Sequence, residues 1–392
     1  MKIAWISSWP PRPCGIATYS LELVEAIKKE GVEVHIICHT DGGKPGEKNV
    51  YPVINLKETD WQDKLYLKVK QINPDILHIQ HEYGLYSVDA DWSAGLFRPL
   101  FRWRIEENFP IVVTFHSVYS ELGKERKTFL DIIQRVINAG IVHEYHQWLA
   151  LHVNLGRIID NFYIIPHGAK ENISFSREDA KRALGLEGKK IIGMIGWFTP
   201  TKGFHRVINM WDSISKKTGS DTYLILAGEA REGEEVQKEY KRKLLSLVEK
   251  CKNKDKIKVI IKNFSPEEYE KVVASFDVAV LPYTFISQSG TLAHSFSLGV
   301  PAVASSLEGL KAEIEASGGG ILVPPDDNEE LRKAIVTLIK DDTLREKLSQ
   351  KALRYVKEKI GWSIVAKKHI KLYEKLIREK KSLKDLKKEA TL

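Results

Sequence analysis

Short apolar runs alternate along this chain with longer amphipathic stretches, and this alternation decides the fold class. A short apolar run is typical of a buried strand and an amphipathic stretch is typical of a helix, so the pattern indicates strand–helix units and parallel sheets. The alternation begins at Lys2–Ser8, is interrupted by the polar segment Ala169–Glu178, and starts again at Lys190–Gly196. A chain of 392 residues is long enough for two cores. The sequence therefore predicts an α/β protein with two Rossmann-like parallel-sheet domains.

The same pattern gives the expected boundaries. We expect an N-terminal domain over residues 1–167, a C-terminal domain over 168–361, a last helix over 362–378 that packs back on the first domain, and a basic tail over 379–392. The strands expected in the first domain are Lys2–Ser8, Val32–Cys38, Ile76–Gln80, Ile111–Phe115 and a strand ending at Tyr163–Gly168, with Leu149–Leu155 as a further apolar run after helix Thr128–Ala139. Those expected in the second are Lys190–Gly196, Thr222–Ala227, Lys256–Ile261, Val278–Leu281, Ala302–Ser305 and Gly320–Val323.

Turns marked by glycine lead from a strand into a helix near both ends of the alternation. Trp9–Thr18 follows the first strand, Trp197–Gly203 follows Lys190–Gly196, and Ser287–His294 follows Val278–Leu281. In open α/β sheets, ligands bind beyond the carboxyl ends of the strands. A lysine and helix N-termini at such ends suit a ligand with a diphosphate, and a nucleotide sugar is the leading candidate.

Individual residues of these turns are candidates for phosphate binding. Lys202 offers a compact cation, and Ser289, Gly290 and Thr291 offer hydroxyl and backbone N–H groups at the start of a helix. Gly15 lets the backbone approach a ligand closely. Each has a plainer interpretation, namely a solvated lysine, an ordinary serine N-cap and a glycine that only the turn requires.

Histidines at strand ends are the next candidates. His116 follows Ile111–Phe115 and could orient a sugar hydroxyl, or be a satisfied structural residue. His81 and Glu82 belong to a dense polar group after the strand at Ile76, which could bind an acceptor or serve only packing.

Two further features favour plain interpretations. His143 and His146 are three apart on an expected helix, but the His-Glu-x-x-His pattern is absent, so we predict no metal site. The expected helix Trp92–Ile105 could present an apolar face to a membrane or an acceptor, although core packing explains it better.

Composition limits the class of protein. Hydrophobic residues make up 43% and charged residues 29%, which is typical of a soluble globular chain. Three cysteines without a pairing motif, and no apparent leader, favour a cytoplasmic protein. The net charge is +8, and residues 362–392 carry ten Lys or Arg against four Asp or Glu. This tail is a solvated helix end or a contact with anionic lipid, so peripheral membrane association stays open. No nucleic-acid motif is present, and we expect no nucleic-acid partner.

Several motifs, in order, resemble the retaining glycosyltransferases of family 4, which have the GT-B fold. The resemblance runs from Ile3 to about Tyr373. The matching segments are Pro10–Thr18, Val113–Ser117, Ile164–Gly168, Thr199–Gly203, Gly299–Ser305, Glu313 and Gly320–Pro324. The resemblance implies two Rossmann-like domains that face each other across a cleft.

Three positions depart from the family pattern. Most of the family has an arginine directly after the glycine that aligns with Gly196, where it contacts the diphosphate, whereas this chain has Trp197. The family also has two glutamates, and the aligned positions are Ile286 and His294. A bacterial and archaeal subgroup shares this form of the turn, so the resemblance implies altered donor contacts in an active enzyme.

The resemblance also implies a mechanism. A hexose would pass from a nucleotide donor, with GDP-mannose or UDP-glucose expected, to a sugar or lipid-linked acceptor with retention at the anomeric carbon. Lys202 and the N–H groups at 289–291 would stabilise the leaving diphosphate, and His116 would position the donor sugar. Trp197 and His294 would contact the donor, with His294 on the ribose. No metal or other cofactor is expected, and the domains would close around a hinge near His167–Gly168.

Other functions remain open at this point. A glycoside phosphorylase would use orthophosphate in the Lys202 pocket, and a sugar-nucleotide epimerase would need no acceptor. A non-catalytic binder of nucleotides or sugars would keep the fold and lose turnover. A dehydrogenase would need a Gly-x-Gly-x-x-Gly turn, which the sequence lacks.

Overall fold

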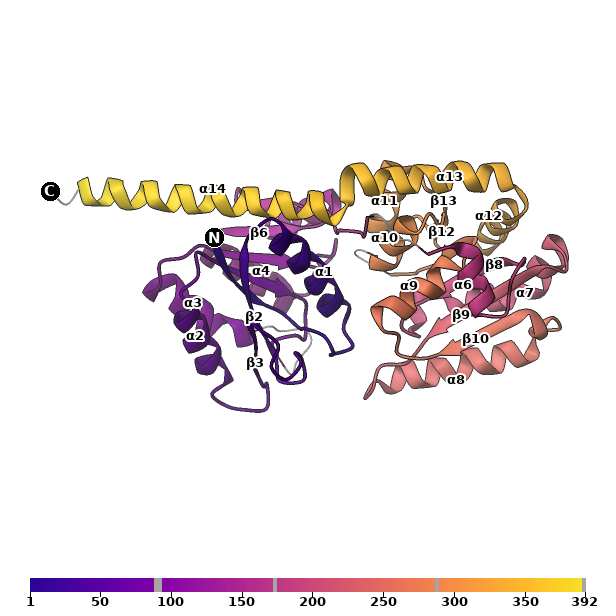
Figure 1. The fold of residues 1–392 in the computed structure, drawn as a ribbon, viewed down its shortest axis with the longest axis horizontal. Helices are drawn as coiled ribbons and strands as arrows, with labels where there is room; N and C mark the ends of the chain where they lie inside the picture. Colours follow the sequence, from indigo (N-terminus) through magenta and orange to yellow (C-terminus); the bar gives the residue numbers. More distant parts are fainter. Residues whose placement is uncertain (88–93, 172–174, 286–288, 390–392) are drawn as a thin grey trace. The chain divides into compact units, whose positions relative to one another are not determined.

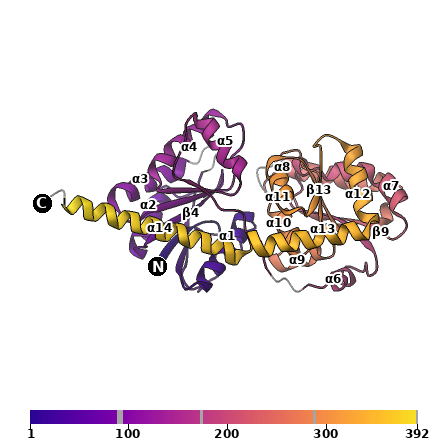
Figure 2. The same ribbon diagram turned by 90° about the horizontal axis from the view of Figure 1, so that it is seen from above.

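A computed structural model describes residues 1–87, 94–171, 175–285 and 289–389. The chain divides into two compact units, which we call unit 1 (Met1–Gly168 with Trp362–Leu392) and unit 2 (Ala169–Gly361). The expected boundary after residue 167 lies next to this division. Both sheets are wholly parallel and carry helices on both faces (Figures 1 and 2), so the predicted α/β class with two Rossmann-like units is confirmed.

Unit 1 contains a seven-stranded sheet with the order β3–β2–β1–β4–β5–β6–β7. Its strands are β1 (Lys2–Ile6), β2 (Glu33–His39), β3 (Val50–Ile54), β4 (Ile76–His81), β5 (Ile111–Phe115), β6 (Ala139–Val142) and β7 (Phe162–Ile164). Helices α1 (Gly15–Lys29) and α14 (Trp362–Glu389) pack on one face of this sheet. The other face carries α2 (Trp61–Ile72), α3 (Phe97–Glu106) after the 3-10 turn Ala94–Leu96, α4 (Lys124–Val136) and α5 (Tyr145–Leu155).

Unit 2 contains a six-stranded sheet with the order β10–β9–β8–β11–β12–β13. Its strands are β8 (Lys190–Ile195), β9 (Thr222–Gly228), β10 (Ile257–Ile261), β11 (Val278–Leu281), β12 (Ala302–Ser305) and β13 (Gly320–Val323). One face packs against α7 (Phe204–Thr218), α8 (Glu235–Lys250) and α12 (Asn328–Lys340). The other packs against α9 (Pro266–Ala274), α10 (Gly290–Ser297) and α11 (Glu308–Ser317). The unit also has α6 (Arg177–Ala183), the 3-10 turns Pro200–Lys202 and Lys254–Lys256, and α13 (Asp342–Tyr355), which continues into a π-helical turn, Val356–Ile360.

Some expected elements are wrong. The apolar run Leu149–Leu155 belongs to helix α5, and the strand before it is β6, whose first residue fell inside the helix expected over Thr128–Ala139. This strand is hard to recognise because it is short and contains Gly140, where a Cβ would lie 2.4 Å from the ring of Phe162. β3 and α2 were not expected at all. The linker predicted to extend to Glu178 ends earlier, because α6 begins at Arg177.

Helix α14 is longer than expected. It continues past Arg378 to Glu389, so part of the predicted tail 379–392 is helical. The residues after Arg378 include neither glycine nor proline and are rich in good helix formers, which explains the continuation. Among the helices of the described residues, none has the length and apolar content that crossing a bilayer requires.

Candidate functional site

The turn after β8 holds Lys202 beside the end of β11. Its Nζ donates a 2.8 Å hydrogen bond to the hydroxyl of Tyr283 and lies 4.1 Å from the centre of that ring. Within the described parts of the chain, no carboxylate forms an ion pair with this lysine. Its charge is therefore available to an anionic ligand at the carboxyl ends of β8 and β11, which are neighbours in the sheet.

Two contacts fix this turn to the segment after β11. The amide of Thr284 donates to Thr201 O at 3.0 Å. Arg206, at the start of α7, donates from Nη1 to Pro282 O at 3.0 Å. Gly203 has φ +69° and its backbone lies so close that a Cβ would be 2.2 Å from Pro282 O. Packing against Pro282 therefore requires a glycine at position 203 whether or not a ligand binds.

Glycines also bring the strand ends together. Gly196 follows β8 with φ +136°, and Gly228 ends β9 with φ +155°. A Cβ on Gly228 would lie 1.9 Å from Gly196 O, so no other residue fits there without movement. This close approach constrains the backbone at Gly196 and therefore the position of Trp197, which directly follows Gly196.

Trp197 occupies the position where the resembling family has an arginine, and an arginine from another segment lies next to it. The guanidinium of Arg231, in the segment after β9, lies 5.1 Å from the centre of the Trp197 ring. This is cation–π distance. A cation is therefore present next to the β8 turn although the sequence has none at position 197, and the strand-end position of Arg231 is the signal that could have found it.

The first turn of α10 forms a capped helix N-terminus. Ser289 is the N-cap, and its hydroxyl accepts from the amide of Leu292 at 3.4 Å. Thr291 Oγ1 accepts from the hydroxyl of Tyr269 at 3.1 Å. The ring of His294 packs edge-on against Tyr269, with 5.4 Å between centroids, and its Nδ1 is buried without a hydrogen-bond partner in the described chain. Ser287 and Ile286 lie outside the described residues.

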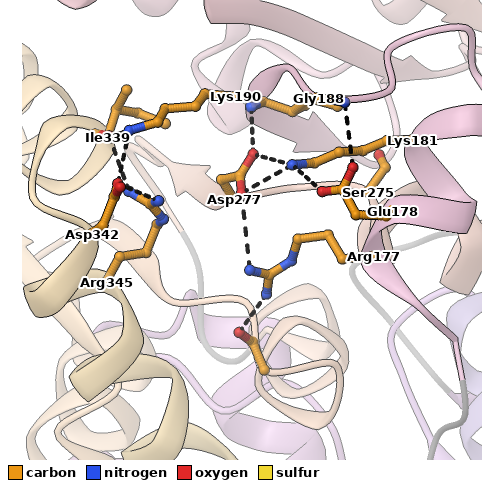
Figure 3. A network of polar contacts seen from close by, with 12 residues as sticks. Arg177, Glu178, Lys181, Gly188, Lys190, Ser275, Asp277, Ile339, Asp342 and Arg345 are labelled. Carbon is orange, nitrogen blue, oxygen red and sulfur yellow. Dashed lines mark hydrogen bonds and ion pairs between the residues drawn. The ribbon is translucent and has the colours of Figure 1, made fainter.

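A buried ion pair holds the two strands that carry these turns (Figure 3). Asp277 precedes β11, and its Oδ2 accepts from the amide of Ile191 in β8 at 2.7 Å. Lys181 of α6 lies 3.0 Å from the same oxygen, and both side chains are buried. Arg177 adds a hydrogen bond of 2.9 Å from Nη2 to Gly299 O. The network connects α6, β8, β11 and the segment before β12.

In unit 1, His116 lies at the end of β5 inside a buried polar chain. Its Nε2 is 2.9 Å from Gln80 Oε1, and its Nδ1 is 3.3 Å from His143 Nε2. His143 Nδ1 in turn donates to Ile165 O at 3.0 Å. Burial lowers the pKa of His143 to about 4 and the pKa of His116 well below its usual value, so both rings are neutral at pH 7. His116 Nε2 donates to Gln80 Oε1, and the nitrogens that face each other, His116 Nδ1 and His143 Nε2, are the unprotonated nitrogens of the two neutral rings.

The residues expected to bind an acceptor differ in accessibility. His81 is buried and stacks on Phe129 with 4.7 Å between centroids, and burial lowers its pKa to about 3. Glu82 is partly exposed, and its two oxygens accept from the amide of Tyr83 at 2.9 Å and the hydroxyl of Ser117 at 2.5 Å. His81 occupies a core position, while Glu82 lies at the surface of the strand end.

Three other predictions from the sequence concern residues of unit 1. Gly15 is the first residue of α1, and a Cβ there would meet nothing within 4 Å, so this helix start is open. His143 and His146 do not share a helix, because His143 precedes α5 and His146 lies on it. Of the helix expected over Trp92–Ile105, the described part buries Leu100 and Trp103 in the core and leaves Ile105 exposed.

Comparison with known proteins identifies the family. The model of Glycosyltransferase Family 4 matches residues 13–153, and that of Glycosyl transferases group 1 matches residues 176–355. The chain is 24% identical to spore coat protein SA of Bacillus subtilis over 51% of its length and 52% of that protein, so it spans only about half of this relative. It is 22% identical to phosphatidyl-myo-inositol mannosyltransferase of Mycobacterium leprae over 92% of its length and 93% of that protein.

Solved structures share the fold over nearly the whole chain. Sucrose-phosphate synthase from Thermosynechococcus elongatus has a TM-score of 0.74 at 20% identity, covering 97% of this chain and 100% of that one. Anabaena Alr3699/HepE in complex with UDP-glucose has a TM-score of 0.73 at 16% identity, covering 96% and 100%. The two family models together cover most of the chain, and with this shared fold they confirm that the protein belongs to the GT-B glycosyltransferases, in the group of family 4.

Proposed function

We propose that this protein transfers a hexosyl group from a nucleotide-diphosphate sugar to a carbohydrate or glycolipid acceptor, with retention at the anomeric carbon. The observation that carries the proposal is the amine of Lys202, which has no carboxylate partner among the described residues and lies at the adjoining ends of β8 and β11. The complex of HepE with UDP-glucose and the name of the mycobacterial mannosyltransferase support a hexose donor. GDP-mannose and UDP-glucose are the proposed donors, in that order.

In this proposal the protein stabilises the departing diphosphate. Lys202 and the N–H groups of residues 289–291 would neutralise charge as the bond to the sugar breaks. The helix start at Gly15 would add a further anion site, and Trp197 and His294 would contact the nucleotide. The acceptor hydroxyl would attack on the side from which the diphosphate leaves, and the phosphate would take its proton, so no carboxylate nucleophile or metal ion is needed.

Unit 1 would contribute to both sugars. His116 would position the donor sugar once a sugar hydroxyl replaces one of the two contacts that its ring nitrogens now make. Glu82, with His81 behind it, would contact the acceptor. A glycolipid acceptor would bring the protein to a lipid surface, and the basic residues 379–392 are one candidate for that contact.

A thermal-shift panel with UDP, GDP, ADP and their glucose and mannose conjugates tests donor binding. We expect one nucleotide family to raise Tm, and Lys202→Ala to abolish that rise and lower turnover by about 10²- to 10³-fold, because a preorganised charge at the leaving group is lost. Lys216→Ala, an exposed lysine of α7, is the matched control and should behave as wild type. A folded protein whose Tm responds to none of these nucleotides would overturn the transferase proposal.

Two further measurements test the mechanism. Activity should survive an excess of EDTA, because charge stabilisation is assigned to side chains and backbone amides. The product should keep the anomeric configuration of the donor, as read from its proton NMR spectrum. An inverted product would refute the front-face mechanism, and loss of activity in EDTA that Mg²⁺ restores would refute metal independence.

A further inference from the structure

Arg206, in the first turn of α7, is a buried cation without a carboxylate partner. It is 7% exposed, and no ion pair joins its guanidinium to an Asp or Glu in the described part of the chain. The carboxylates whose charges reach it, those of Asp326 and Asp327, lie beyond ion-pair distance. Burial lowers the pKa of Arg206, because the charged form is less stable away from water. Keeping this charge inside unit 2 costs free energy, which its hydrogen bonds have to offset.

The hydrogen bonds of Arg206 connect two segments at the carboxyl edge of the unit 2 sheet. Its Nε donates to Asn328 Oδ1 at 2.8 Å, at the start of α12, which lies beside α7 (Figure 2). Its Nη1 donates to Pro282 O at 3.0 Å, directly after β11. The guanidinium is planar and rigid, so the two bonds together fix the Pro282 carbonyl. Nη2 is buried and lacks a hydrogen-bond partner among the described residues, so Arg206 acts on the rest of unit 2 through these two bonds.

The residue after Pro282 is Tyr283, whose hydroxyl holds Lys202. Because the Pro282 carbonyl and the Tyr283 amide share one planar peptide group, fixing the first also fixes where Tyr283 begins. Tyr283 is 2% exposed, and its hydroxyl oxygen accepts from Lys202 Nζ at 2.8 Å. The Lys202 side chain also passes close to Gly196, where a Cβ would lie 3.7 Å from Cε and 3.8 Å from Nζ. The ammonium is therefore held by a buried phenol and confined by the backbone after β8.

A lysine that is held in advance binds an anion better than a mobile one. A lysine side chain has several rotatable bonds, and ordering them when a ligand binds reduces the affinity. A charge that is already in place also needs no rearrangement when negative charge develops on a leaving group. Tyr283 and Arg206 can supply this order from inside unit 2, because both are buried.

We propose that Tyr283 and Arg206 are positioning residues for Lys202. The Tyr283 hydroxyl holds the ammonium where an anionic group can meet it, and Arg206 holds the backbone that carries Tyr283. This inference rests on the proposed function, in which the anionic group is the diphosphate of the donor. It also explains why a charge without a carboxylate partner is kept inside unit 2.

Acetylation of lysine amines, measured residue by residue by mass spectrometry on the full-length protein, tests the positioning without a donor. We expect an N-hydroxysuccinimide ester of acetic acid to modify Lys202 about tenfold faster in Tyr283→Phe and in Arg206→Met than in wild type, because the amine is released from the phenol. The exposed Lys216 should react at one rate in all three proteins. An equal rate at Lys202 in wild type and Tyr283→Phe would overturn the proposal.

Tyr163→Phe is the matched control. The Tyr163 hydroxyl accepts from Lys375 Nζ at 3.0 Å in unit 1, so this variant removes the same kind of contact elsewhere. It should leave the rate at Lys202 unchanged, and a rise as large as that in Tyr283→Phe would also count against the proposal. An unchanged Tm shows that a variant is folded. Tyr283→Phe keeps the ring, so it still tests the proposal if Arg206→Met does not fold.

Transfer kinetics separate positioning from a general effect on the fold. Tyr283→Phe should lower kcat about tenfold with a smaller change in KM, because the position of the charge matters most as the diphosphate departs. In the Lys202→Ala background the same change should have less than about a twofold further effect, because no ammonium is left to position. A loss that multiplies with that of Lys202→Ala would show that Tyr283 acts independently of Lys202, and the proposal would fail. Acetylation needs no donor, so a protein in which Tyr283→Phe releases Lys202 but which transfers no hexose would refute only the transferase function.

Discussion

At the scale of single residues, the cation beside Trp197 bears on the proposed binding of a nucleotide-sugar donor. Arg231 lies over the Trp197 ring, next to the turn that holds Lys202. We predict that Arg231→Ala raises KM for the donor about tenfold with little change in kcat, because a charge-assisted contact to the diphosphate is lost in ground and transition states alike. Arg242→Ala, an exposed arginine on α8, should leave KM unchanged, and an equal effect of both variants would argue against a specific role.

The sequence predicts where strands end better than it predicts which side chains contact one another. Lys202 and Ser289 were found because both follow apolar runs, and the fold explains why such positions gather at one edge. The sequence does not say that β8 lies between β9 and β11, so it could not pair Lys202 with Tyr283 or Trp197 with Arg231. Nor could it separate His81, which is buried, from Glu82, which follows it directly.

At the scale of elements, the ion pair of Asp277 and Lys181 ties α6 to β8 and β11. We predict that Asp277→Asn lowers the free energy of unfolding of unit 2 by about 3 kcal/mol, because a buried ammonium group loses its closest carboxylate. Glu267→Gln removes one partner of the exposed pair with Lys271 and should cost less than about 1 kcal/mol. Urea denaturation of the two variants measures both values, and similar losses would show that burial is not what makes the Asp277 pair important.

Elements were predicted best where a short, mainly apolar strand is bounded by proline, glycine or a polar residue. β11, β12 and β13 have the expected bounds. β3 was missed because proline and partial exposure hide its pattern, and β6 because it follows α4 almost without a break. In both cases pairing with a neighbouring strand stabilises a strand that the local sequence does not predict: β3 pairs with β2, and β6 pairs with β5.

At the scale of the whole molecule, the two units differ in how deeply their histidines are buried and in how far burial lowers the histidine pKa values. In unit 1, burial lowers the pKa of His81 to about 3 and those of His143 and His369 to about 4, and it lowers those of His78 and His116 well below 6.5. In unit 2, His205 is the histidine with a lowered pKa in the described chain, and it is less deeply buried. Neutral buried histidines make folding sensitive to mild acid, because the unfolded chain binds protons that the folded chain excludes.

We therefore predict that unit 1 loses stability before unit 2 as the pH falls. The stabilisation is complete above the unfolded pKa of about 6.5 and decreases toward the folded values, by up to about 1.4 kcal/mol per pH unit for each histidine. Hydrogen exchange of the full chain at about pH 7.5 and about pH 5.5, corrected for intrinsic rates, should show protection falling more in β4 and β5 than in β11 and β12. His81→Phe keeps an aromatic ring against Phe129 and removes one titrating group, so it should make the loss in unit 1 shallower. An equal loss in both units, or no effect of His81→Phe, would mean that these buried rings do not control the acid response.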